Sequence, residues 1–170
     1  MAVYFVRHTA VAARNICYGQ KEMPLADNFE TEARQIQASL PVLETFSLVS
    51  STSERTRQLA DFLSADYTTD ERLKEISFGE WEGVAWHDLD QQQVKEWGND
   101  WMNITPPGAE PFSDFTERVI EFVESRLTDK SIVITHAGVI RVALSHLWRR
   151  PLHKMFEIKV PYSAVFQVDL

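Results

Sequence analysis

Two histidines lie where apolar runs end, one near the start of the chain and one near its end. Val6-Arg7-His8-Thr9 continues the run that begins at Val3, and His136 follows the run 132–135. Runs of β-branched and aromatic residues predict buried strands. Open α/β sheets bind ligands at the carboxyl ends of their strands. Both imidazoles are therefore candidates for chemistry on a small bound substrate.

Two arginines accompany the histidines. Arg7 precedes His8, and Arg55 follows Ser50-Ser51, where another short apolar run ends. A guanidinium is planar, permanently charged and matched to phosphate oxygens. A neutral imidazole is a competent nucleophile, and cations that hold the equatorial oxygens supply much of the catalysis of phosphoryl transfer. The set predicts phosphoryl transfer from a monoester, with Arg7, Arg55 and His136 on the phosphate and no metal or cofactor required.

Such a reaction also needs a carboxylic acid that protonates the departing alkoxide and then activates water. Three glutamates lie in the segment from Leu73 to Gly83. Glu75 is the candidate, and Glu80 and Glu82 are its competitors.

Two further effects are expected to favour an attacking imidazole and a bound anion. The helix after His136 should present free backbone N–H groups near Ala137 and Gly138, which favour anions. The nearby arginines should keep the imidazole of His8 neutral, because a like charge opposes protonation.

The elements that position these residues alternate along the chain. Strands are expected at 3–6, 47–50, 132–135 and 165–168, and helices at 29–40, 53–63, 112–127 and from 138 or 139 to about 148. Asp27 is expected to cap the first helix and Pro41 to mark its end. Alternating strands and helices predict an α/β fold with a mostly parallel central sheet and helices on both faces.

The segment 67–109 differs from its surroundings, because it holds four of the five tryptophans and the breaker Pro106-Pro107-Gly108. We interpret it as an insertion over the sheet edge, a lid or a pocket wall, within a single domain that spans 1–170. Trp86, Trp97 and Trp101 either pack this segment or stack on a planar substrate group. Packing is the favoured interpretation.

Composition limits the partners. The 170 residues carry a formal net charge of -8, which opposes general binding to nucleic acid or anionic membranes and leaves a small phosphorylated substrate as the expected partner. Cys17 is the single cysteine, and neither a zinc-type cluster nor a signal or membrane-spanning segment is evident. A cytoplasmic location is therefore expected.

Four of these segments, taken in order, resemble the motifs of the histidine phosphatase superfamily, whose fold is phosphoglycerate mutase-like. They are Val6-Arg7-His8-Thr9, Ser50-Ser51 with Arg55, Leu73 to Gly83, and Thr135 to Arg141. Cys17-Tyr18-Gly19-Gln20, followed by Met23-Pro24-Leu25, is similar to the alpha-ribazole phosphatase branch. The resemblance covers nearly the whole chain.

The resemblance implies a role for each candidate residue. His8 is the phosphorylated nucleophile, Glu75 is the proton donor, and Arg7, Arg55 and His136 hold the phosphoryl group. The implied activity is metal-independent hydrolysis of a phosphate monoester, with alpha-ribazole 5'-phosphate of cobalamin nucleotide-loop assembly as the favoured substrate. A broad-specificity phosphatase and a catalytically silent phosphate-binding module remain alternatives.

Some positions depart from the superfamily pattern. Thr52-Ser53 stands where a proline-leucine pair is usual, Thr9 where glycine is usual, and Ala109-Glu110-Pro111 where the branch often has Gly-Glu-Ser. Asn15 lies near, but offset from, an asparagine that contacts phosphate in relatives. The loss of the serine at Pro111 leaves the substrate, rather than hydrolysis, open, and Asn15 is not counted among the site residues.

Overall fold

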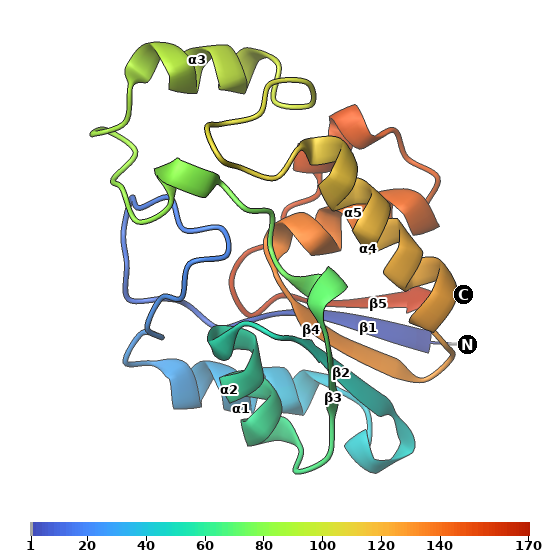
Figure 1. The fold of residues 1–170 in the computed structure, drawn as a ribbon. Coiled ribbons are helices and arrows are strands. Elements are labelled where there is room, and N and C mark those ends of the chain that lie inside the picture. The colour runs from blue at the N-terminus through green and yellow to red at the C-terminus, as the bar shows by residue number, and fades with distance from the viewer. Residues whose placement is uncertain (1) are drawn as a thin grey trace.

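The computed structural model describes residues 2–170 and contains a five-stranded sheet flanked by helices (Figure 1). The strands are β1 (Ala2–Arg7), β2 (Ser47–Ser51), β3 (Thr68–Asp70), β4 (Ser131–Thr135) and β5 (Val165–Asp169). Their order across the sheet is β3-β2-β4-β1-β5. All neighbours pair in parallel except β5, which runs antiparallel to β1.

Apolar composition places β1 and β4 at the centre of the sheet. Every residue of β4 is buried, as expected of a parallel strand that helices cover on both faces. The two strands pair in register from Tyr4 opposite Ile132 to Arg7 opposite Thr135. Because the register is fixed by this burial, the residues that follow both strands must emerge together at one edge of the sheet.

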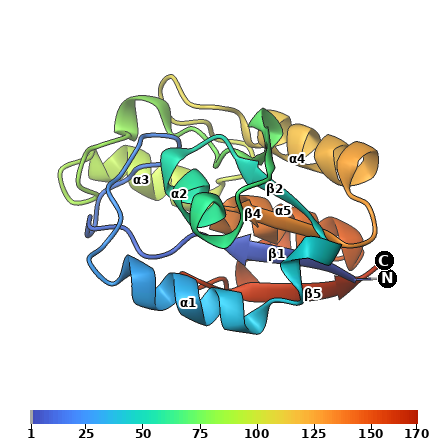
Figure 2. The ribbon, with the colours of Figure 1, turned by 90° about the horizontal axis from the view of Figure 1, so that it is seen from below.

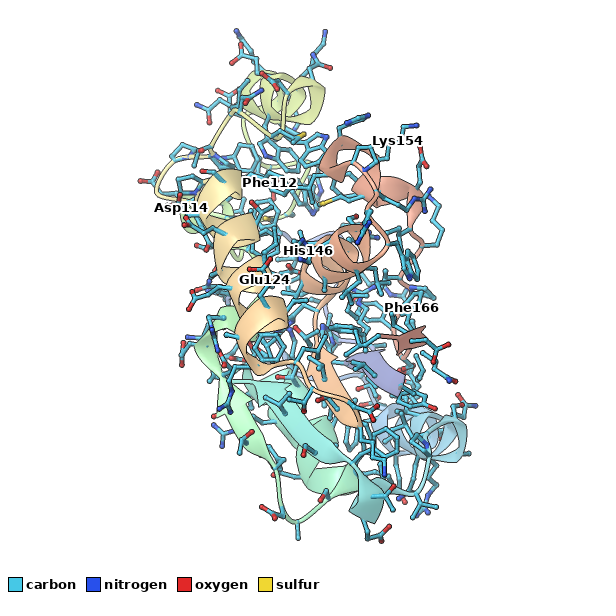
Figure 3. The ribbon with its side chains drawn as sticks, turned by 90° about the vertical axis from the view of Figure 1, so that its right-hand side faces the viewer. Phe112, Asp114, Glu124, His146, Lys154 and Phe166 are labelled. Atoms are coloured by element: carbon cyan, nitrogen blue, oxygen red, sulfur yellow. The ribbon has the colours of Figure 1, made fainter. Side chains whose placement is uncertain are left out.

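Helices cover both faces of the sheet. The helices α1 (Phe29–Ser39) and α2 (Glu54–Leu63) lie on one face, and α4 (Phe112–Arg126) and α5 (Ala137–Leu147) on the other (Figures 1 and 2). Side chains alternate between the two cores: Phe5 and Val133 contact α4 and α5, whereas Ile132 and Ile134 contact α1 and α2. Figure 3 shows α4 and α5 side by side, with His146 Nε2 3.3 Å from Glu124 Oε1 across them.

A third layer is built from the tryptophan-rich segment. It contains α3 (Gln91–Asn99) and lies beyond the end of the sheet, beside the loop that follows β1 (Figure 1). Trp81, Leu89 and Cys17 form a small separate core there, with Trp86 and Trp97 packed against it. Trp86 and Trp97 stack with ring centroids 6.1 Å apart, so the packing role expected of these two residues is present.

The four expected strands and four expected helices are all present, with ends displaced by one or two residues. The expected cap at Asp27 is wrong: Asn28 occupies the N-cap position and makes no side-chain cap hydrogen bond. β3 and α3 were not expected, and β3 belongs to the sheet although it lies in the segment interpreted as an insertion. Of the helices within residues 2–170, none has the length and apolarity to cross a membrane.

Candidate active site

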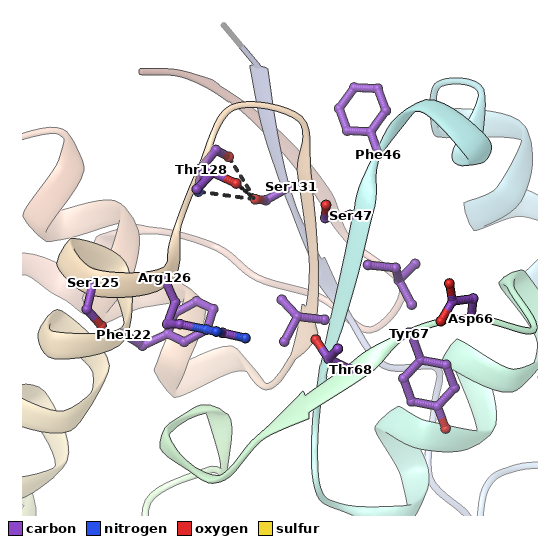
Figure 4. Close-up of a pocket in the computed structure, with 12 residues that line it drawn as sticks. Phe46, Ser47, Asp66, Tyr67, Thr68, Phe122, Ser125, Arg126, Thr128 and Ser131 are labelled. Carbon is purple, nitrogen blue, oxygen red and sulfur yellow. Dashed lines mark hydrogen bonds between the residues drawn. The ribbon is translucent and has the colours of Figure 1, made fainter.

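A small pocket of about 150 Å³ opens at the carboxyl ends of β1, β2 and β4, and it brings together all five predicted site residues. Its lining comprises Arg7, His8, Ile16, Cys17, Tyr18, Gly19, Arg55, Glu75, Phe78, Trp86 and His136. A larger cavity of about 510 Å³ lies at the opposite end, beside Ser47 and Ser131, the first residues of β2 and β4 (Figure 4). None of the predicted site residues lines that larger cavity.

The sheet register brings the two histidines together. His8 follows β1 and His136 follows β4; both are about 1% exposed, and their ring centroids are 5.3 Å apart. His8 Nδ1 lies 2.8 Å from the carbonyl oxygen of Thr9. Since a carbonyl only accepts, Nδ1 carries the proton and Nε2 of a neutral ring keeps its lone pair. Ser51 Oγ, at the end of β2, lies 3.0 Å from His136 Nε2.

Burial and positive neighbours keep both imidazoles neutral. The pKa of His8 is lowered well below 6.5, chiefly by desolvation and then by Arg55 and Arg7. Desolvation likewise lowers the pKa of His136, with Arg55 and His8 adding to the effect. The arginines act as the sequence led us to expect, but burial is the larger cause.

The two arginines are anchored by carbonyl groups. Arg7 Nη1 donates to the carbonyl of Val160 (2.7 Å), and Arg55, which is 1% exposed, donates through Nη2 to the carbonyl of Gly19 (2.6 Å). Burial lowers the pKa of Arg55, an effect that the carboxylate of Glu75 opposes. Arg55 also forms a long ion pair with the half-exposed Glu22, with 3.8 Å between Nη1 and Oε2. The carbonyl partners do not neutralise the guanidinium groups, and an exposed ion pair is weak, so positive charge remains available to an anion in a chain that is acidic overall.

Several buried polar atoms around the pocket have no hydrogen-bond partner among residues 2–170. They are the Nε atoms of Arg7 and Arg55, Nδ1 of His136 and Oγ1 of Thr9. Buried donors are nearly always paired, so a group of unpartnered ones is a site for a ligand that accepts hydrogen bonds. The two arginine donors are cationic, and an anion is the acceptor that suits them best.

Glu75 is the only one of the three candidate glutamates that lines the pocket. Its Oε2 accepts the backbone N–H of Gly138 at 2.9 Å, in the first turn of α5. The N–H of Gly138 is therefore not free, contrary to expectation. Glu82 instead accepts the N–H groups of Gln20 and Phe78 through Oε1, and Glu80 is exposed.

Other residues singled out from the sequence have structural contacts here. Burial, followed by the charge of Glu82, raises the pKa of the Cys17 thiol to about 12, so this group stays protonated. The side-chain amide of Gln20 donates to the carbonyl of Glu75 at 3.1 Å. Asn15 does not line the pocket, and its carbonyl accepts the N–H of Trp86.

Two tyrosines flank the arginines, and the sequence did not single out either of them. The ring of Tyr162 lies 3.9 Å from Arg7 Cζ and that of Tyr18 lies 5.2 Å from Arg55 Cζ. Their hydroxyls are 2.7 Å apart. Tyr18 lies in the Cys17-Tyr18-Gly19-Gln20 motif. Tyr162 carries no sequence signal, because it reaches the site only through the turn before β5.

An apolar cavity of about 210 Å³ adjoins the pocket and shares Glu75 and Phe78 with it. The remaining lining is Ile76, Trp97, Trp101, Phe112, Phe115, Gly138, Arg141, Met155 and Phe156. Trp101 packs edge-on against Phe112 and Phe156, both with centroids 4.9 Å away. The three tryptophans therefore differ: Trp86 lines the pocket, and Trp97 and Trp101 line this cavity.

Within residues 2–170, no group of three or more His, Cys, Asp or Glu side chains is arranged to hold a metal ion. The residues that converge on the pocket are instead two cations, two neutral imidazoles and a carboxylate.

Comparison with known proteins agrees with this geometry. Residues 3–170 match the model of the histidine phosphatase superfamily (branch 1). The chain belongs to this superfamily. The adenosylcobalamin/alpha-ribazole phosphatase of Escherichia coli (strain K12) is 24% identical over 100% of this chain and 90% of that protein.

Solved structures give the same assignment and confirm the predicted fold class. A phosphoglycerate mutase from Thermus thermophilus superposes with a TM-score of 0.78 at 31% identity, covering 99% of this chain and 93% of that one. The alpha-ribazole phosphatase from Shigella flexneri shares the fold, with a TM-score of 0.90 at 23% identity over 100% and 91% of the two chains.

Gly138→Ala should reduce activity without reducing stability. The added Cβ would overlap Glu75 Oε1, the end of a flexible side chain, so the carboxylate must move. Alanine in a helix is otherwise favoured over glycine by about 1 kcal/mol. We expect phosphatase activity to fall at least about tenfold, the scale of general acid catalysis, while the melting temperature stays level or rises.

The matched control is Gly98→Ala in α3, where an added Cβ would meet nothing within 4 Å among residues 2–170 apart from its chain neighbours and the backbone of its own helix. This variant should keep full activity. Equal activity in the Gly138→Ala and Gly98→Ala proteins would contradict a role for the carboxylate at this position.

The two neutral histidines should make stability depend on pH. Below about pH 6.5 the unfolded chain binds protons on His8 and His136 that the folded protein does not. The free energy of unfolding should therefore fall as the pH falls from about 7 to about 5.5, by at most about 1.4 kcal/mol per pH unit for each histidine. Urea unfolding at each pH measures this slope, and His8→Asn should reduce it; an unchanged slope in the His8→Asn protein would contradict the prediction.

Proposed function

We propose that this protein hydrolyses phosphate monoesters through a phosphohistidine on His8. Arg7 and Arg55, each with an unpartnered Nε, line the same pocket as a neutral, buried imidazole, and this is the observation that carries the proposal. Membership of the histidine phosphatase superfamily supports it.

The first half-reaction forms the covalent intermediate. His8 Nε2 attacks phosphorus while the P–O bond to the alcohol breaks and Glu75 delivers a proton to the departing oxygen. Arg7, Arg55 and His136 hold the phosphoryl oxygens. Their charge matters most in the transition state, because positioning and electrostatics supply most of the catalysis in phosphoryl transfer.

The second half-reaction releases phosphate. Glu75, now a carboxylate, takes a proton from water, and the oxygen of that water attacks the phosphohistidine as the P–N bond breaks. His8 returns to its neutral form with Nδ1 still bonded to the carbonyl of Thr9. The backbone contact therefore fixes which nitrogen reacts in every cycle.

The intermediate can be trapped with a radiolabelled phosphate ester. After quenching, label should be retained in alkali and lost in acid, as expected of a phosphorylated imidazole. His8→Ala should carry no label and show no turnover, whereas His146→Ala, a change outside the pocket, should behave as wild type. A His8→Ala protein that still hydrolyses substrate would refute the assignment.

For the substrate, we favour alpha-ribazole 5'-phosphate. The names of the Escherichia coli and Shigella flexneri relatives point to this ester. The apolar cavity supports it, because this cavity shares Glu75 with the pocket and so adjoins the carboxylate that is proposed to protonate the leaving oxygen. A cavity of about 150 Å³ lined by apolar side chains is large enough to bind benzene, and this one measures about 210 Å³.

Phosphoglycerate is the second candidate substrate. The Thermus thermophilus structure at 31% identity is named as a phosphoglycerate mutase. Arg141 lines the apolar cavity, and its guanidinium could pair with a carboxylate there. The remaining lining is mainly aromatic and aliphatic, which favours a planar apolar group over a small acid.

A panel of esters separates these possibilities. We expect kcat/KM to rank alpha-ribazole phosphate above 3-phosphoglycerate and para-nitrophenyl phosphate. Trp101→Ala should lower the first value by about threefold to tenfold, the scale of a lost aromatic contact, and change the other two less. Equal losses on all three esters in the Trp101→Ala variant would argue against stacking. Similar wild-type rates for all esters would favour a broad-specificity phosphatase. Phosphate binding without turnover would favour a catalytically silent module.

A further inference from the structure

Glu75 lies in a segment that belongs to no helix or strand. Residues 75–78 are irregular, between 3-10 turns at Glu71–Leu73 and Gly79–Trp81. The histidines and Arg7, by contrast, sit at the ends of paired strands. The N–H of Gly138 holds the carboxylate itself, but no sheet or helix hydrogen bonds hold the backbone of residues 75–78, so other groups must satisfy it.

Arg118 of α4 donates three hydrogen bonds to Glu75 and to the turn that precedes it. Its Nη1 donates to the carbonyls of Arg72 (2.6 Å) and Lys74 (2.8 Å), and its Nη2 donates to the carbonyl of Glu75 at 3.1 Å. The guanidinium also lies 4.9 Å from the centroid of the Phe115 ring. One planar group thus holds three carbonyls on the segment that leads to the candidate acid.

Glu110 completes the arrangement. Its Oε1 lies 2.6 Å from Arg118 Nε and its Oε2 lies 2.9 Å from Arg118 Nη2, a bidentate pair in which each side chain is less than 20% exposed. Glu110 Oε2 also accepts the backbone N–H of Ser77 at 3.3 Å, and the N–H of Glu110 donates to the carbonyl of Ser77. Arg118 and Glu110 therefore hold the backbone on both sides of Glu75.

We propose that Arg118 and Glu110 are positioning residues that hold Glu75 where it protonates the leaving oxygen. Neither residue lines the phosphate pocket or the adjoining cavity, so both act through Glu75 rather than on the substrate. The inference rests on the proposed function, since it assigns Glu75 the role of general acid. A lysine cannot replace Arg118, because a single ammonium lacks the planar fork that reaches Glu110 and the carbonyls together.

Comparing esters with good and poor leaving groups separates the contribution of Glu75 as general acid from the other contributions to the rate. A nitrophenolate leaves with little help, whereas an alkoxide needs a proton, so a defect in the general acid appears mainly on alkyl esters. The ratio kcat/KM reports the steps up to release of the alcohol, including phosphorylation of His8. We would measure it for para-nitrophenyl phosphate and glycerol 3-phosphate with Arg118→Lys and, separately, Glu110→Gln.

Both variants should lose about tenfold or more in kcat/KM on glycerol 3-phosphate and less than about threefold on para-nitrophenyl phosphate. The matched controls are Arg126→Lys and Glu117→Gln, exposed residues of the same helix α4. They should retain wild-type values on both esters. Melting temperatures identify the variants that fold. If Arg118→Lys is unstable, Glu110→Gln still tests the inference, because glutamine keeps the shape of glutamate and one acceptor oxygen.

A double variant gives the decisive readout. If Arg118 acts through Glu75, adding Arg118→Lys to Glu75→Gln should cause no further loss on glycerol 3-phosphate. Additive losses, or equal losses on the two esters in a folded variant, would overturn the inference while leaving the proposed function intact. A wild-type protein that hydrolyses neither of these esters nor alpha-ribazole phosphate would overturn the proposed function and this inference with it.

Discussion

The parallel pairing of β1 with β4 is the constraint on which the site depends. The pairing is set by apolar side chains that are buried on both faces, and a shift of one residue would turn each of them towards the wrong core. The same register places His8 and His136 next to each other as the strands end. The same apolar side chains therefore stabilise the sheet and set the geometry of the histidine pair.

Hydrophobic periodicity and the order of the motifs along the sequence predicted the central strands, the helices that pack on them and the five candidate site residues. The strands ending at Arg7 and Thr135 and the helices behind them were predictable, because each buries an apolar face in a regular repeat. The short strand at Thr68–Asp70 was not, since its composition is polar and only pairing with β2 defines it. Tyr162 and Arg118 were missed for a related reason: contacts that join distant segments leave no local pattern.

The choice among three glutamates shows what the sequence alone could not decide. Glu75, Glu80 and Glu82 lie close together along the chain, and their order favours none of them on physical grounds. Folding separates them, because Glu82 is used to satisfy two backbone N–H groups and Glu80 faces solvent. Of the three, only Glu75 reaches both the pocket and the apolar cavity.

The phosphate pocket and the apolar cavity are built from different parts of the fold. The groups proposed to hold phosphate lie at or beside strand ends. The adjoining apolar cavity is instead built from the tryptophan-rich segment, the start of α4, α5 and the turn after α5. Changes in those connecting segments can alter the leaving group without disturbing the histidine pair. A superfamily whose members include proteins named as a mutase and as alpha-ribazole phosphatases is what this arrangement permits.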